Sequence, residues 1–160
     1  MVLFTQCIFL EKDAVLPKAV PYTGSQLKIN GYYYRFSKDN NYILFPFIMY
    51  KNGILIDTSN GENSIEAMDD YIRKHYVNDT RHKRNKYFWG VFFINDDKII
   101  INTLYNSYPH VGIIMEGVIL NDTTLHITKY VFDNKEREFD AVYHFREFYP
   151  KPDSTNTYIK

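Results

Sequence analysis

The dominant pattern in the chain is a pair of apolar runs joined by a short polar stretch. Residues 87–95 and 98–105 are rich in aromatic and β-branched side chains, with an Asp-Asp pair between them. This composition predicts a β-hairpin in which Phe92 lies opposite Ile101. Both faces of the hairpin are largely apolar, so neither can lie in water. We therefore expect one face to line a core or cavity and a further element to cover the other.

Six further runs of apolar or alternating residues predict strands. The Asn52-Gly53 pair separates two of these runs and favours the positive φ angles of a type I′ turn. Pro46 has no backbone donor, which places it at a bulge or an edge. A polar loop over 133–138 separates the last two runs. The runs cover residues 27–36, 42–50, 54–58, 111–120, 123–132 and 139–149, the fifth starting at Thr123 or Thr124.

One segment has helical periodicity instead. Asn63 or Ser64 can cap a helix, and the apolar residues that follow fall on one stripe. This amphipathic helix lies between the third and fourth predicted strands, so its stripe must rest on the central hairpin or on the open end of a barrel. The charged stretch 78–86 after it is expected to be a solvated loop. The residues of the stripe are Ile65, Met68, Tyr71, Ile72 and Tyr76.

The predicted fold is mainly β, with eight antiparallel strands mostly in meander order and one helix. Such a meander can close into an up-and-down barrel, which has no exposed edge and has an interior sized for side chains or one small ligand. A β-sandwich is the alternative. The chain then divides into an N-terminal segment over residues 1–25, a barrel domain over 26–149 and a C-terminal tail over 150–160.

Length and charge narrow the class of protein. The 160 residues fit one domain with a core large enough to fold alone. Lys plus Arg and Asp plus Glu number 19 each. The chain therefore lacks the basic surplus that nucleic acids attract, and no nucleic-acid partner is expected. Aromatic residues make up 18% of the chain, which agrees with a β-rich protein that has amphipathic pockets.

The lone cysteine, Cys7, follows a short and mostly apolar lead over residues 1–6. A lipoprotein signal peptide ends in a similar way, directly before the cysteine that receives the lipid. Lipid attachment at Cys7 is one interpretation, and an ordinary small apolar cysteine in a docked segment is the other. A complete signal peptide would require a charged and apolar stretch before Met1. Residues 8–24 show no sustained period and indicate a tether or an extended arm that leads to the domain.

Several short motifs together resemble a known group of proteins. With Cys7, they are similar to small uncharacterised lipoproteins of Gram-negative bacteria that have a lipocalin-like barrel. The resemblance covers the chain from about Leu27 to the end. It implies a lipid-anchored location in the cell envelope, facing the periplasm or the outer surface, with a cytoplasmic protein as the alternative. The motifs are Asn30-Gly31-Tyr32-Tyr33, Trp89-Gly90, Glu116-Gly117, residues 120–128, Tyr143-His144-Phe145 and residues 150–156.

No pattern for catalysis is present. The chain lacks a Gly-rich phosphate loop, a Cys or His pair at zinc spacing and a nucleophile elbow. We therefore expect neither an enzyme nor a cofactor. If residues 133–138 form a symmetric turn, His126 and His144 become cross-strand neighbours. A metal site needs at least one further ligand, so no metal is expected there.

Glu116 interrupts the apolar run 111–120, where a buried lone carboxylate is costly. Its direction depends on the turn that follows. A two-residue turn at Asn121-Asp122 points Glu116 inward, where it could anchor a ligand and pair with Arg35. A three-residue turn through Thr123 points it outward into solvent.

Two classes of function fit these features. In the first, a non-enzymatic envelope lipoprotein binds a small hydrophobic ligand in the barrel mouth. The ligand-binding residues would be Tyr33, Phe47, Trp89 and Tyr143, with Glu116 as a polar anchor. In the second, aromatic side chains fill the barrel, and the protein is a structural or protein-interaction module with an unknown partner. The volume of the interior distinguishes the two classes, because small-ligand pockets measure roughly 300 Å³ or more.

Overall fold

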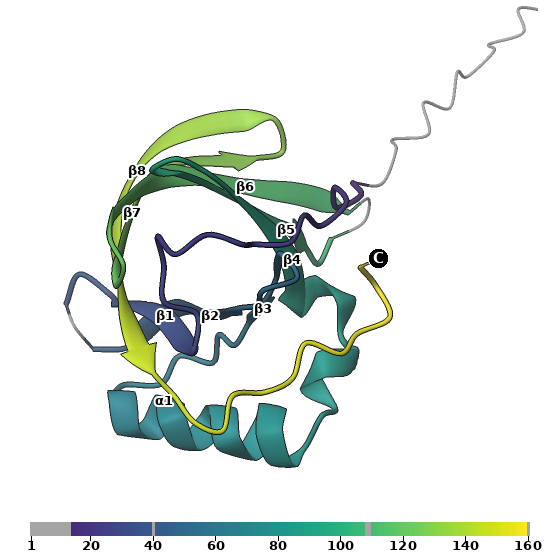
Figure 1. Ribbon diagram of the computed structural model, residues 1–160, viewed down its shortest axis with the longest axis vertical. Helices are drawn as coiled ribbons and strands as arrows, with labels where there is room; N and C mark the ends of the chain where they lie inside the picture. The colour runs from purple at the N-terminus through teal and green to yellow at the C-terminus, as the bar shows by residue number, and fades with distance from the viewer. Residues whose placement is uncertain (1–13, 40, 108–109, 160) are drawn as a thin grey trace, which may run out of the picture.

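Eight antiparallel strands in sequential order form a closed barrel in the computed structural model, which describes residues 14–39, 41–107 and 110–159 (Figure 1). The first strand pairs with the last, and Tyr33 lies opposite Phe145 there. This closure confirms the predicted barrel and excludes the sandwich. The strands are β1 (Gly31–Phe36), β2 (Ile43–Met49), β3 (Ile54–Asp57), β4 (Trp89–Asn95), β5 (Lys98–Tyr105), β6 (Val111–Asn121), β7 (Thr124–Phe132) and β8 (Lys135–Glu147).

The β4–β5 hairpin forms in the predicted register. Phe92 lies opposite Ile101, and the two belong to the core inside the barrel. Trp89 and Val91 belong to a second core outside the barrel wall. Both apolar faces of the hairpin are therefore covered, as its composition requires.

Two turns differ from the predicted ones. Between β2 and β3, Gly53 has a positive φ but Asn52 does not, so this turn lacks the two positive φ angles of type I′. Between β7 and β8, Asp133 and Asn134 have φ angles of 50° and 57°. These are the paired positive angles of a tight two-residue hairpin turn. The polar loop predicted over 133–138 is therefore wrong, and β8 starts directly after this turn.

The predicted amphipathic helix is confirmed. It consists of α1 (Ile65–Ile72) and a π-helical continuation, η1 (Arg73–Asn78), which together span 14 residues. Ser64 caps α1, because its hydroxyl oxygen accepts the N–H of Ala67 at 3.1 Å. The apolar stripe of the helix packs against the outer face of β1 to β4 (Figure 1). No helix in the described ranges is long and apolar enough to cross a membrane.

The N-terminal segment passes across one end of the barrel (Figure 1). The N–H of Tyr22 donates to the carbonyl of Lys51 at 2.7 Å, and the N–H of Lys28 donates to that of Asp122 at 2.8 Å. Leu27 is buried in the interior core. Part of the predicted tether thus contacts the domain and closes the barrel end that carries the β2–β3 and β6–β7 turns. The described residues leave the opposite end open.

The C-terminal tail lies on the helical side of the barrel (Figure 1). Directly before the tail, Phe148 packs against Tyr32, with ring centroids 6.0 Å apart. Two short 3₁₀ helices, η2 (His82–Arg84) and η3 (Lys86–Phe88), occupy the predicted charged loop. The ammonium group of Lys83 is buried there and lies 2.8 Å from the carboxylate of Asp153 in the tail. The tail is therefore part of the folded domain.

Candidate functional site

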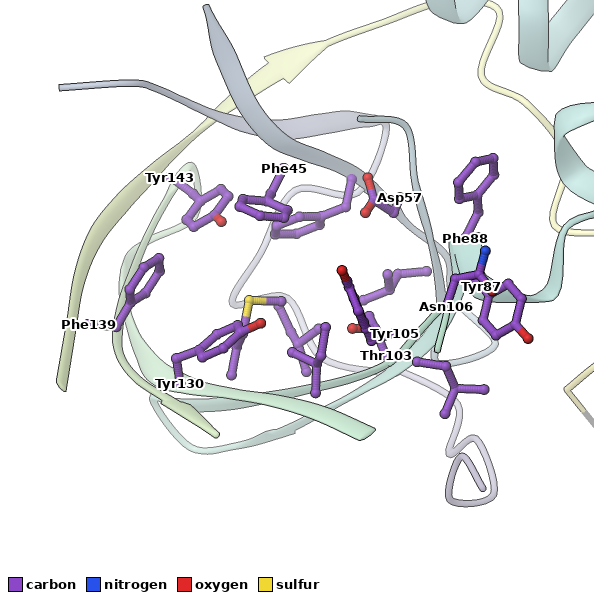
Figure 2. Close-up of a pocket in the computed structure, with 16 residues that line it drawn as sticks. Phe45, Asp57, Tyr87, Phe88, Thr103, Tyr105, Asn106, Tyr130, Phe139 and Tyr143 are labelled. Carbon is purple, nitrogen blue, oxygen red and sulfur yellow. The ribbon is translucent and has the colours of Figure 1, made fainter. Parts of the chain in front are cut away.

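The open end of the barrel contains a cavity of about 250 Å³ (Figure 2). Its wall is formed by β2, β3, β5 to β8, η3 and the residue after β5. Half of the lining residues are aromatic, which makes the wall mostly apolar. They are Phe45, Phe47, Leu55, Asp57, Tyr87, Phe88, Ile101, Thr103, Leu104, Tyr105, Asn106, Ile113, Met115, Tyr130, Phe139 and Tyr143.

A layer of aromatic rings packed against one another forms the floor of the cavity. The ring centroids of Phe47 and Tyr143 are 5.2 Å apart, and Tyr33 stacks on Phe47 at 5.8 Å. The Tyr33 hydroxyl donates to the carbonyls of Lys28 at 2.9 Å and Asp122 at 3.2 Å, both at the closed end. The interior is thus filled on the closed side of this layer and hollow on the open side.

Arg35 is the charged residue that β1 directs toward this wall. It follows Tyr33 by two positions, so the two side chains share the inner face of the strand. Its guanidinium carbon lies 5.2 Å from the ring centroid of Phe139 and 5.8 Å from those of Phe45 and Tyr143. Its Nε is buried without a hydrogen-bond partner. Arg35 forms no ion pair within the described ranges.

A bulge in β2 shapes the mouth of the cavity. The register changes between the Tyr33–Phe47 and Arg35–Leu44 pairs, which confirms the expected irregularity at Pro46. Phe45, within this bulge, has a φ of 45°, a left-handed conformation that is unfavourable for a bulky residue. Its side chain is 48% exposed, and its ring faces both the cavity and Arg35.

Tyr143 places a second unpaired polar group on the same wall. Its side chain is fully buried and its hydroxyl oxygen has no hydrogen-bond partner. Burial raises the pKa of this hydroxyl, and both the positive charge of the adjacent Arg35 and a hydrogen-bond contribution from its side chain oppose the rise. The hydroxyl is turned toward the cavity in Figure 2. Tyr143 thus lines the cavity, and Arg35 lies directly behind the wall, against the rings of Phe45, Phe139 and Tyr143.

Asp57 contributes a carboxyl group to the wall at the end of β3. Its Oδ1 accepts the N–H of Ser59 at 2.7 Å. Burial raises the pKa of Asp57 above its usual range, and the hydrogen bonds from Ser59 partly oppose the shift. The carboxyl group thus bonds to the loop after β3 and not to Arg35.

The structure separates the residues that the sequence predicts for ligand binding. Phe47 and Tyr143 line the cavity, whereas Tyr33 lies one layer deeper. Trp89 is fully buried in the outer core between the barrel wall and the helix. The expectation that Trp89 lines the interior is wrong. Both faces of its strand are apolar, so alternation alone does not show which face points inward.

Glu116 points outward. The β6–β7 register shifts between Glu116 and Gly117, and Met115 is the neighbour that faces the interior. The carboxylate of Glu116 lies 2.8 Å from the ammonium group of Lys129. Glu116 is therefore a partner in a surface ion pair, which is the outward alternative, and the inward alternative, a polar ligand anchor paired with Arg35, is wrong.

The other predicted sites give no functional cluster. The early start of β8 places His126 opposite Val142, and His126 Nε2 lies 2.8 Å from the carboxylate of Asp140. His126 and His144 are therefore not cross-strand partners. Within the ranges that the structure describes, no group of three or more His, Cys, Asp and Glu side chains could hold a metal ion. The predicted lipidation site, Cys7, lies outside those ranges.

Sequence reasoning missed the parts that Phe45, Asp57 and Phe139 play in the cavity, and it offered Arg35 only Glu116 as a partner, in one of two alternatives. The sequence does contain a sign that Arg35 has a role, because a charged residue on an otherwise apolar inner face needs a partner or a function there. Two of its three ring neighbours, Phe139 and Tyr143, come from β8, near the other end of the sequence. No local pattern specifies that meeting, because it depends on closure of the barrel.

Comparisons of the chain with protein-family models, curated proteins and solved structures find no match. The similarity to lipocalin-like lipoproteins therefore stays a prediction. The basis for a functional assignment is the cavity and the side chains around it.

Proposed function

We propose that this protein binds a compact, mostly apolar small molecule in the open end of its barrel and catalyses no reaction. The observation that carries the proposal is the cavity of about 250 Å³ with its aromatic wall. Small-molecule sites are typically concave and mostly apolar, with a few polar groups that orient the ligand. Asp57, Thr103 and Tyr143 supply such groups here.

The volume limits the size of the ligand. Sites for drug-sized molecules measure roughly 300 to 1,000 Å³, and this cavity is slightly smaller. A single aromatic ring with a short substituent matches the space better than a long acyl chain, which would extend out of the mouth. The expected ligand is therefore compact.

A structural or protein-interaction role is the second candidate. The filled part of the interior favours it, because Leu27, Tyr33 and Ile127 are almost completely buried among other side chains. Small barrels are often filled along their whole length. The ligand-binding experiment described below distinguishes the two roles.

We also propose that a lipid on Cys7 anchors the protein in the cell envelope, with a cytoplasmic location as the alternative. The support is the apolar lead over residues 1–6 directly before this cysteine. The gene with its natural upstream region would be expressed in cells fed an alkyne-labelled fatty acid. Label on the native protein and none on Cys7→Ser is expected. If the same fraction of the native protein and of Cys7→Ser is found in the membrane, the proposal of a lipid anchor on Cys7 is contradicted.

Methionine methyl groups provide a direct test of ligand binding. Met115 lines the cavity, whereas Met68 lies on the buried face of α1 in the outer core. In a protein with ¹³C-labelled methionine methyl groups, titration with toluene or indole should shift the Met115 signal and leave the Met68 signal in place. An unmoved Met115 signal at saturating probe would contradict the proposal and favour the interaction role.

Matched variants locate the binding site. Thr103→Phe adds a ring inside the cavity and should abolish the Met115 shift. Asn102→Phe adds the same ring on the outer face of β5, since neighbouring positions of a strand alternate, and should bind the probes normally. Loss of binding in both variants would indicate damage to the fold and not a blocked cavity.

A further inference from the structure

We infer that the natural ligand is a compact monocarboxylic acid whose carboxylate binds Arg35 and Tyr143 while its apolar body fills the rest of the cavity. This inference rests on the proposed function, because it names the chemical class of the molecule that the cavity holds. It starts from two buried atoms without hydrogen-bond partners, Nε of Arg35 and the hydroxyl oxygen of Tyr143.

Tyr143 lines the cavity, Arg35 packs directly behind its ring, and both atoms can donate a hydrogen bond. Buried polar groups in folded proteins are nearly always paired, so two unpaired donors at one cavity indicate an acceptor that comes from outside. Arg35 and Tyr143 are carried by β1 and β8, which pair directly. The guanidinium carbon lies 5.8 Å from the Tyr143 ring centroid. A carboxylate offers two acceptor oxygens, which suits two neighbouring donors.

The charges around the cavity favour an anion. Arginine stays protonated at physiological pH, and Arg35 forms no ion pair within the described ranges. Asp57 is the acidic residue of the wall, and its carboxylate already accepts the N–H of Ser59. Lys86 adds a positive charge 5.0 Å from the ring of Tyr87. A carboxylate on the ligand would supply the missing counter-charge for Arg35.

The position of Arg35 also explains why the acid should be short. The three rings around its guanidinium, Phe45, Phe139 and Tyr143, themselves line the cavity. The carboxylate site and the apolar space are therefore adjacent. An aromatic or branched body can make ring-edge and ring-face contacts with this wall, and no long spacer is needed between the body and the carboxylate.

A purely structural Arg35 is the competing explanation. A guanidinium group packed against aromatic rings is attracted to them without any ligand. Those contacts, however, leave Nε of Arg35 and the hydroxyl of Tyr143 unpaired. The two explanations differ in one measurable respect, because only an anion site distinguishes a charged ligand from a neutral ligand of the same shape.

The experiment compares 3-phenylpropanoate with 3-phenylpropanamide by calorimetry and by the Met115 methyl signal. The acid should bind the native protein at least about tenfold more tightly, since charge-assisted hydrogen bonds are the strong ones. Arg35→Met should reduce the affinity for the acid to that for the amide and leave the amide unchanged. Arg35→Lys should recover only part, because an ammonium group lacks the planar fork of a guanidinium.

Controls keep the outcomes distinct. Arg84→Met removes an exposed arginine from η2 and should change neither affinity. Equal binding of acid and amide to the native protein would overturn this inference and leave the proposed function standing. Binding of neither, with an unmoved Met115 signal, would overturn both.

If Arg35→Met does not fold, Tyr143→Phe tests whether a carboxylate binds at this site. This variant removes only a hydroxyl group that has no partner in the structure. A several-fold loss of affinity for the acid alone would support the carboxylate site. An unchanged ratio of acid to amide affinity would overturn it.

Discussion

The indole Nε1 of Trp89 donates a hydrogen bond of 2.7 Å to the carbonyl oxygen of Lys83. This bond joins the start of β4 to η2, and it is buried in the outer core. The same residue packs beside Tyr50, with ring centroids 6.4 Å apart. Trp89 thus holds the helical layer against the barrel wall and is remote from the interior, which makes it a test of the outer core.

Trp89→Ala should lower the free energy of unfolding by about 3 to 5 kcal/mol, the usual range for truncation of a buried aromatic side chain. Trp89→Phe keeps most of the apolar contact but leaves the Lys83 carbonyl unpaired, which should cost about 1 to 3 kcal/mol. Urea denaturation followed by circular dichroism measures both. A loss under about 1 kcal/mol for Trp89→Ala would contradict the importance of the outer core.

The hairpin that contains Trp89 shows what local patterns can predict. Its pairing of Phe92 with Ile101 follows from two apolar runs and a short polar turn, all within one stretch of chain. Which face of the hairpin points into the barrel cannot be predicted from this stretch, because both faces are apolar and the contacts that decide it come from distant segments. Ser64 and the helix it caps were predictable for the same reason as the hairpin, since capping is a local interaction.

The wrong predictions, those for the 133–138 loop and for the inward direction of Glu116, have two different physical causes. The polar stretch 135–138 predicts a loop, yet these residues are exposed on a projecting part of β8, where polar side chains are tolerated (Figure 1). The direction of Glu116 depends on a register shift between it and Gly117, which alternation cannot reveal. At the candidate site, Phe47 and Tyr143 were predictable from apolar strands, whereas the meeting of Arg35 with Tyr143 requires the closed barrel.

The closed end of the barrel depends on the Tyr33 hydroxyl, which donates to the carbonyls of Lys28 and Asp122. Tyr33→Phe should lower stability by about 1 kcal/mol, a typical net value for a hydrogen bond. It should also increase amide hydrogen exchange at residues 20–30 more than in β5. Tyr34→Phe is the control, since that hydroxyl forms no hydrogen bond within the described ranges. Equal exchange in both variants would show that the hydroxyl does not hold this end closed.

The ion pair between Lys83 and Asp153 should make stability depend on acid pH. Lys83 holds the pKa of Asp153 at about 2, below its usual value. Because the folded-state pKa is depressed, this stabilisation is present above about pH 4 and is lost as the pH falls toward 2. Asp153→Asn should cost about 1 kcal/mol at pH 7, a low value because the side chain is largely exposed.

The measurement is the unfolding free energy of the native protein and of Asp153→Asn between pH 2 and 7. The difference between them should shrink as the pH falls through that window. Asp97→Asn removes an exposed carboxylate that has no ion pair within the described ranges and serves as the control. A difference that stays constant with pH would mean that the pair does not stabilise the tail.

The effect of Asp57 on the pH dependence of stability should have the opposite sign to that of Asp153. Burial raises the pKa of its carboxyl group, so its ionised form destabilises the folded state once the pH rises above the unfolded-state pKa of about 3.9. Asp57→Asn keeps an oxygen to accept the N–H of Ser59 and should be more stable than the native protein at pH 7. The advantage should disappear as the pH is lowered toward 4, which thermal unfolding at a series of pH values measures. An Asn variant that is less stable at pH 7 would contradict this assignment.

Phe45 combines backbone strain with a position at the cavity mouth. Its φ of 45° costs about 1 to 2 kcal/mol for a residue with a Cβ atom and little for glycine. Phe45→Ala removes the half-exposed ring and keeps the strain, whereas Phe45→Gly removes both. The free energy of unfolding should therefore be about 1 kcal/mol higher for Phe45→Gly than for Phe45→Ala. Equal stability of the two variants would show that the φ angle is not strained.

Both variants should exchange ligand faster, because the ring that narrows the mouth is gone. Stopped-flow mixing with 3-phenylpropanoate measures the association rate. Relaxation of the Met115 methyl signal at equilibrium is a separate experiment that measures the dissociation rate. The two rates should rise together in Phe45→Ala and in Phe45→Gly, to a similar extent, whereas Phe93→Leu on β4, away from the residues that line the cavity, should leave them unchanged. A larger rise in Phe45→Gly alone would assign the effect to chain flexibility. Unchanged rates in both would mean that the ligand enters elsewhere.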